Sequence, residues 1–175
     1  MRIYRKIIPK IAKDVVRCLL AQEAIEAEDG HRDDVELDVA GAVVEYLDDI
    51  DRVKQDARAT LERKGMGLEN LLRAQERLAI ARNVVMGDSA FDHVVTRIIE
   101  SLFNSKAVTE VFLDDKELQS IVGASVQKYV GVDEELDREI RGKLRNLREG
   151  TPEWEAEYSR LIEHMRAQMR QDTNE

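Results

Sequence analysis

The chain repeats its own pattern at an offset of 83 residues, and this feature restricts the fold more than any other. Helical sequences can match locally by chance because both repeat about every 3.6 residues, but chance should not hold one register across several helices and loops. The sequence therefore predicts an internal duplication, with repeat units at residues 1–86 and 87–175. Identical pairs at this offset include Leu19 with Leu102, Val39 with Val122, Val43 with Val126, Tyr46 with Tyr129, Arg58 with Arg141 and Leu61 with Leu144.

Each predicted repeat unit contains about four helices. Apolar residues of the first helix fall on one stripe at the spacing of a helix face. Second and third helices are expected around residues 35–47 and 50–61, and in the other copy around 118–130 and 136–147. The first-helix stripes are Ile8, Ile11, Val15 and Leu19 in one unit and Phe91, Val94, Ile98 and Leu102 in the other.

The segments between the first and second helices, residues 24–34 and 107–117, are acidic and turn-like, although Val108–Phe112 could form a short strand. Aromatic residues make up only 5% of the chain, so the core has to be aliphatic. We expect an all-α protein of two similar units, packed on a shared core with an approximate internal two-fold.

The third helix of the second unit has acidic residues near its start and basic residues near its end, as the helix dipole prefers. Asp137 with Arg141 and Glu139 with Lys143 have the spacing of ion pairs one turn apart. We interpret these charges as a solvated face.

The only tryptophan lies at the start of the predicted fourth helix. Thr151 is a plausible N-cap and Pro152 suits the first helical position, where its missing N–H is not needed. Trp154 corresponds to Leu71 in the other repeat, which favours a packing role over stacking on a ligand. The predicted structural core includes Leu19, Tyr46, Leu61, Leu102, Tyr129, Leu144, Trp154 and Tyr158.

The run VDEELDREIRGKLRNLREGTPEWEAEY at residues 132–158 resembles a bacterial family called domain of unknown function 507. The opening MRIYRKIIPKIAKDVVR and the segment YLDDIDRVKQDARATLERKG are similar to it too, and the resemblance covers nearly the whole chain. Its most specific motif, Glu-Gly-Thr/Ser-Pro-Glu-Trp, corresponds to Glu149 to Trp154. The resemblance implies a bacterial, soluble, helical protein and no catalytic or binding residue.

Composition narrows the cellular setting. The N-terminus begins basic like a signal peptide, but Lys10, Lys13 and Asp14 interrupt its apolar residues. No window approaches the roughly 20 apolar residues of a membrane span. Cys18 is the single cysteine, which excludes an intramolecular disulfide and favours a small buried hydrophobe. We expect a cytoplasmic protein with no membrane partner.

No group of residues predicts catalysis, a cofactor or a metal. Glu28 and His31 have Glu-x-x-His spacing, but a di-iron bundle needs two such pairs on helices, and His93 and His164 lack the preceding Glu. Gly-rich phosphate loops and Ser/His/Asp sets are missing as well. An enzyme is therefore the least supported class, and we expect no catalytic, cofactor-binding or metal-binding residues.

The candidate interaction surface is a basic stripe on the first helix, where the two repeats differ. The second repeat places Ser89, His93, Thr96 and Glu100 at the positions of the four central cations. Either the stripe binds a partner, or it balances the acidic block from Glu23 to Asp56, where 13 acidic residues face 3 basic ones. The stripe comprises Arg2, Arg5, Lys6, Lys10, Lys13 and Arg17.

These patterns favour a non-enzymatic helical adaptor or scaffold that binds an unidentified protein partner. The alternative is a nucleic-acid or ribonucleoprotein-associated module that uses the basic first helix. The formal net charge of −9 argues against a general polyanion binder, although a local basic patch can override an average. The sequence leaves homo-oligomerisation open.

Overall fold

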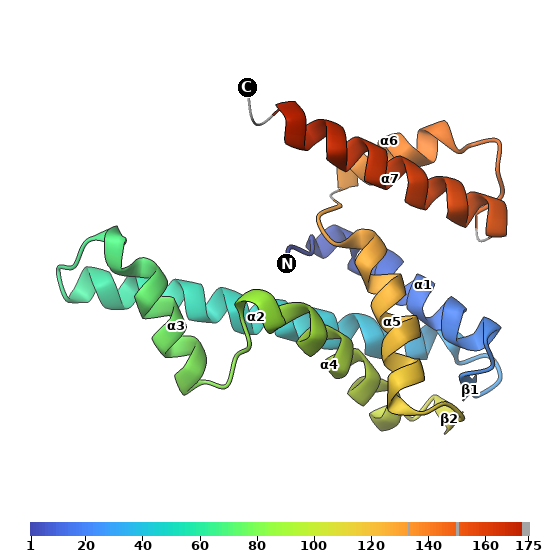
Figure 1. Cartoon of the computed structure of the whole chain (residues 1–175). Coiled ribbons are helices and arrows are strands. Elements are labelled where there is room, and N and C mark those ends of the chain that lie inside the picture. Colours follow the sequence, from blue (N-terminus) through green and yellow to red (C-terminus); the bar gives the residue numbers. More distant parts are fainter. Residues whose placement is uncertain (133, 150, 173–175) are drawn as a thin grey trace. The chain divides into compact units, whose positions relative to one another are not determined.

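A computed structural model describes residues 1–132, 134–149 and 151–172. This part of the chain is mostly helical, with seven α-helices and one two-stranded sheet, so the prediction of a helical protein is confirmed at that level (Figure 1). The elements are η1 (Arg5–Ile7), α1 (Ile8–Ala21), β1 (Ile25–Ala27), α2 (Arg32–Arg63), η2 (Leu68–Asn70), α3 (Leu71–Ala81), η3 (Gly87–Ser89), α4 (Ala90–Asn104), β2 (Val108–Val111), α5 (Asp115–Tyr129), α6 (Glu134–Lys143) and α7 (Pro152–Asp172).

The chain forms two compact units. The first contains Met1 and Ile8–Val126, and the second contains Arg2–Ile7 together with the chain from Gln127 onward. The predicted boundary between residues 86 and 87 lies inside the first unit. A boundary between sequence repeats need not coincide with a boundary between compact units, so the division into 1–86 and 87–175 stays a prediction.

In the first unit, the 32-residue helix α2 replaces the two helices expected around 35–47 and 50–61. The expected break was wrong because no glycine or proline lies between Leu47 and Ile50, so nothing interrupts the backbone hydrogen bonds there. The corresponding chain of the second repeat does break, between α5 and α6, where Gly131 has φ +75°. A glycine adopts this conformation without the steric penalty of a side chain.

Helices α1, α3 and α4 each pack against α2 (Figure 1). The α1 and α4 contacts use the apolar stripes foreseen from the sequence, and Arg97 of α4 adds ion pairs to Glu45 and Asp49 of α2, at 3.1 and 3.2 Å. Since those pairs are partly exposed, the apolar stripes supply most of the stabilisation.

The small sheet departs from a purely all-α fold. Strands β1 and β2 are antiparallel, with Ile25 opposite Val111 and a register shift after Glu26. Backbone hydrogen bonds extend the pairing at both ends, from Glu28 N to Ala107 O at 2.8 Å and from Phe112 N to Ala24 O at 2.9 Å. The β-branched residues of the Val108–Phe112 segment favour this extended conformation over the turn.

The second unit combines the N-terminal segment with the α6–α7 hairpin. Ile3 and Ile7 are buried, and the Gly131 N–H donates to the Arg2 carbonyl oxygen at 2.7 Å. Helix α7 begins with the predicted cap, because the Trp154 N–H donates to Thr151 Oγ1 at 3.3 Å. Pro152 is its first residue, where the missing N–H leaves no bond unmade.

Candidate docking surface

The predicted basic stripe is divided between the two compact units. Arg2, Arg5 and Lys6 belong to the second unit, whereas Lys10, Lys13 and Arg17 lie on α1 of the first. The structure therefore does not establish the six cations as one surface.

Two members of the stripe contact neighbouring side chains. The Arg17 guanidinium pairs with the buried carboxylate of Asp14, one turn earlier on α1. The Arg2 guanidinium lies 4.6 Å from the centre of the Tyr4 ring. Desolvated carboxylates require a cationic partner. The ion pair thus gives Arg17 a structural role, and it had no counterpart in the sequence interpretation.

The structure buries all eight predicted core residues. Leu144, the most exposed, retains 6% of its surface. Trp154 is 4% exposed and stacks on Tyr158, with ring centres 4.7 Å apart. This enclosed position leaves Trp154 without an open face for a ligand.

The charges of α6 are not all solvated, which corrects the sequence interpretation. Glu139 and Lys143 form an exposed pair at 2.9 Å, but Asp137 is fully buried. Its carboxylate accepts from the Tyr158 hydroxyl at 2.6 Å and from Arg141 Nε at 2.9 and 3.0 Å. The correction follows from geometry, because α7 covers this face of α6 and its tyrosine supplies the partner that a buried carboxylate needs.

The residues of the Glu149-to-Trp154 motif close the α6–α7 hairpin. Glu149 pairs with Arg141 at 2.7 Å, and the Arg141 guanidinium also lies 5.2 Å from the centre of the Trp154 ring. Thr151 caps α7, while Gly150 lies outside the described residues. These contacts account for the motif by the stability of the hairpin, without a ligand.

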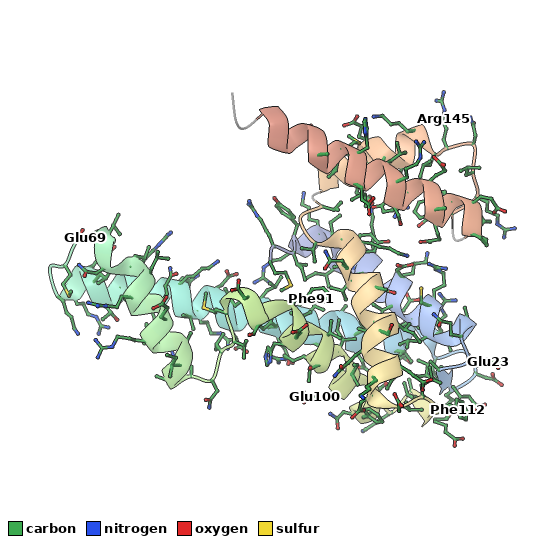
Figure 2. All side chains as sticks on the ribbon, in the orientation of Figure 1. Glu23, Glu69, Phe91, Glu100, Phe112 and Arg145 are labelled. Carbon is green, nitrogen blue, oxygen red and sulfur yellow. The ribbon has the colours of Figure 1, made fainter. Side chains whose placement is uncertain are left out.

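A different feature attracts attention on the α2–α3 hairpin, whose tip carries Glu69 in Figure 2. Leu68, Leu72 and Ile80 are 73%, 75% and 78% exposed. Ala79 is the one residue of α3 that is buried. Sequence reasoning missed this surface, although a signal was present: the second repeat has Thr151, Glu155 and Glu163 at the equivalent positions.

A groove lies between the end of α2 and α3. It has a volume of about 340 Å³. Leu61, Met66, Ala74 and Leu78 supply apolar side chains, and Thr60, Asn70, Lys64, Arg73 and Arg77 complete the lining. The apolar floor and the cationic walls make this the best candidate docking surface of the first unit.

Two acidic hollows elsewhere in the first unit do not have this character. One lies between α2 and α4, and the other contains His31, whose Nδ1 lies 2.7 Å from Asp34 Oδ2. Among the described residues, no three His, Cys, Asp or Glu side chains are grouped to hold a metal ion. Within the same residues, no helix has the length and apolar character needed to cross a membrane.

The two histidines of the first unit should titrate on opposite sides of the ordinary value of 6.5. The hydrogen bond to Asp34 raises the pKa of His31, and nearby Glu28 adds to this effect. Burial lowers the pKa of His93, assisted by the positive charge of Arg97. We expect an NMR pH titration to give a higher midpoint for His31 than for His93.

The raised pKa of His31 has a defined consequence for stability. Its contribution is fully present below the unfolded-state pKa and is lost as the pH rises through the folded-state pKa. Replacing Asp34 with Asn should return the His31 midpoint toward the ordinary value and leave His93 unchanged. Equal midpoints in the parent protein would contradict this assignment.

The fold is that of a mostly helical protein with two compact units and one small sheet. Over residues 1–169 the chain matches the family model described as "Protein of unknown function (DUF507)". The match covers nearly the whole chain, so the protein belongs to this family, and the resemblance recognised in the sequence motifs is confirmed. A search of curated proteins found no match.

Proposed function

We propose that this protein is a non-enzymatic helical adaptor that binds a protein partner through the α2–α3 hairpin. The observation that carries the proposal is the exposure of Leu68, Leu72 and Ile80 on one short stretch of chain. Clustered exposed apolar side chains commonly mark protein interaction sites. The bacterial family resemblance and the single cysteine support a cytoplasmic setting.

The proposal includes the internal duplication. β1 and β2 begin at Ile25 and Val108, and α2 and α5 begin at Arg32 and Asp115, so both pairs start 83 residues apart. Ala24 and Ala107 also differ by this offset, and their carbonyl oxygens accept the hydrogen bonds at the two ends of the sheet. Antiparallel pairing of equivalent strands is the arrangement that a local two-fold produces, which supports two related copies.

The duplication supplies an internal comparison for the hairpin. The α6–α7 hairpin of the second repeat carries Thr151, Glu155 and Glu163 where the α2–α3 hairpin exposes its three large apolar residues. If the repeats share one ancestor, this hairpin geometry does not require apolar residues at those positions. Their presence in the first repeat is then better explained by binding than by folding.

The test replaces the three apolar residues with their counterparts from the second repeat, as Leu68→Thr, Leu72→Glu and Ile80→Glu. We expect capture of protein partners from the native host to fall at least about tenfold, because interfaces lose much of their affinity when central apolar residues are removed. Helix content and thermal stability should remain near those of the parent, since all three side chains are exposed.

The matched control changes three exposed apolar residues outside the hairpin: Leu37→Thr, Phe103→Glu and Phe112→Glu. We expect this variant to retain the same partners. Loss of capture by the control alone, or retention by the hairpin variant, would contradict the proposed surface.

The nucleic-acid alternative is tested in the same capture experiment. Two cations of α1, Lys10 and Lys13, are its structural support, and nuclease treatment should not remove the partners if the adaptor proposal holds. A phosphate grip by Lys6, Lys10, Lys13 and Arg17 would instead give a slope of about −3.6 for log K against log salt on duplex DNA. Neutralising those four residues should leave partner capture unchanged.

A further inference from the structure

The α2–α3 groove combines an apolar floor with cations that the fold leaves available. Lys64 lies at the end of α2, and Arg73 and Arg77 lie one turn apart on α3. Among the described residues, none of these three side chains forms an ion pair with an acidic group of the chain. The contrast with Arg17, which neutralises the buried Asp14, indicates that folding does not require the groove cations.

The hairpin is also positively charged within an acidic protein. Residues 57–82 contain six Lys or Arg and three Asp or Glu, giving a formal charge of +3, whereas the whole chain carries −9. Like charge on two hairpins disfavours the approach of a second copy through this surface. An acidic partner has the complementary charge.

The second repeat shows how such a hairpin is closed from within. There Trp154 stacks on Tyr158, and Glu149 pairs with Arg141. The equivalent positions in the first repeat hold Leu71, Gln75, Met66 and Arg58. The aromatic stack and the acidic group are therefore both missing from the first hairpin.

Extending the proposed adaptor function, on which this inference rests, we infer that the groove binds an acidic amphipathic helix of a protein partner. A large apolar side chain of that helix enters between Leu61, Met66 and Leu78. Its carboxylates lie against Arg73 and Arg77, whose one-turn spacing matches acidic residues four apart on a helix. The partner supplies the apolar and acidic groups that the second repeat carries itself, in the manner of a helix bound in a groove.

The experiment uses the full chain and two synthetic peptides. The probe is a fluorescein-labelled helix of about five turns with one leucine face and one glutamate face, and its partner peptide has lysine in place of every glutamate. Binding is followed by fluorescence anisotropy. The methionine methyl resonances locate it, because Met66 lines the groove and Met165 lies in the other compact unit.

The acidic peptide should bind saturably and shift the Met66 resonance while leaving Met165 in place. Arg73→Glu with Arg77→Glu should weaken binding at least about tenfold, since it replaces attraction with repulsion. The matched control, Lys54→Glu with Lys116→Glu, changes two exposed cations outside the groove by the same total charge and should alter affinity less than about twofold.

Several results would overturn the inference. Equal binding of the lysine peptide would show an apolar surface without charge selection, and equal weakening by both charge variants would show only long-range attraction. A Met66 shift caused by a duplex oligonucleotide but not by the acidic peptide would assign the groove to phosphate. Concentration-dependent dimerisation that shifts Met66 would assign it to a second copy.

Failure of this inference is distinguishable from failure of the adaptor proposal. If the acidic peptide does not bind while the Leu68, Leu72 and Ile80 variant still loses its host partners, the inferred partner chemistry is wrong and the adaptor proposal stands. If that variant keeps every partner, the adaptor proposal fails.

Discussion

Replacing Trp154 with alanine is expected to lower the free energy of unfolding of the second compact unit by about 3–5 kcal/mol. The ring is 4% exposed, stacks on Tyr158 and lies under the Arg141 guanidinium. Alanine would remove the apolar contacts and leave a cavity beside α6. Urea unfolding followed by circular dichroism measures the change, because the variant lacks the only tryptophan of the chain.

A Trp154→Phe variant is the matched control. Phenylalanine keeps an aromatic ring on Tyr158, so we expect it to recover most of the lost stability. If alanine and the parent unfolded at the same urea concentration, Trp154 would not contribute to packing. A ligand-stacking role, which the sequence left open, would then be the better explanation.

The sequence predicts local features well where one residue type has one physical use. Thr151 and Pro152 mark the start of α7, and the cap hydrogen bond to Thr151 is present. The replacement of Leu71 by Trp154 between the repeats indicated a packing position, and Trp154 is buried. Capping and helical periodicity depend on residues near each other in the chain, so they can be read without tertiary information.

Features that depend on distant contacts were not accessible in this way. The spacing of Asp137 and Arg141 is the same in an exposed ion pair and in a buried one, and only the position of Tyr158 decides between them. The continuity of α2 through Leu47–Ile50 likewise depends on the absence of a break, which helix periodicity does not reveal. Tertiary packing overrides the local pattern in both cases.

The candidate docking surface could not be located from hydrophobicity alone. Leu72 and Ile80 belong to an amphipathic pattern, and such residues are normally assigned to the core. They are exposed because α3 packs on α2, and no other α-helix of the described chain covers its outer side to a comparable extent. The comparison between repeats carried the missing information, since Glu155 and Glu163 occupy the equivalent positions.

Replacing Asp137 with alanine is the second change with a large expected effect, again about 3–5 kcal/mol in the free energy of unfolding of the second unit. The carboxylate is fully buried and accepts hydrogen bonds from both Tyr158 and Arg141. Its removal leaves a buried hydroxyl and a half-buried guanidinium without this acceptor. Groups desolvated in this way cost free energy that an exposed pair would not.

The design that separates the network from simple packing is a double-mutant cycle. Asp137→Ala and Tyr158→Phe are measured singly and together, and because each removes one end of the 2.6 Å hydrogen bond, the double change should destabilise less than the sum of the single changes. The first repeat supplies the reason to expect a local effect. Its equivalents, Lys54 and Gln75, cannot form this bond, so the α2–α3 hairpin folds without it. Additive single effects would show that Asp137 acts through Arg141 alone, and an unchanged midpoint for Asp137→Ala would refute the buried network as a source of stability.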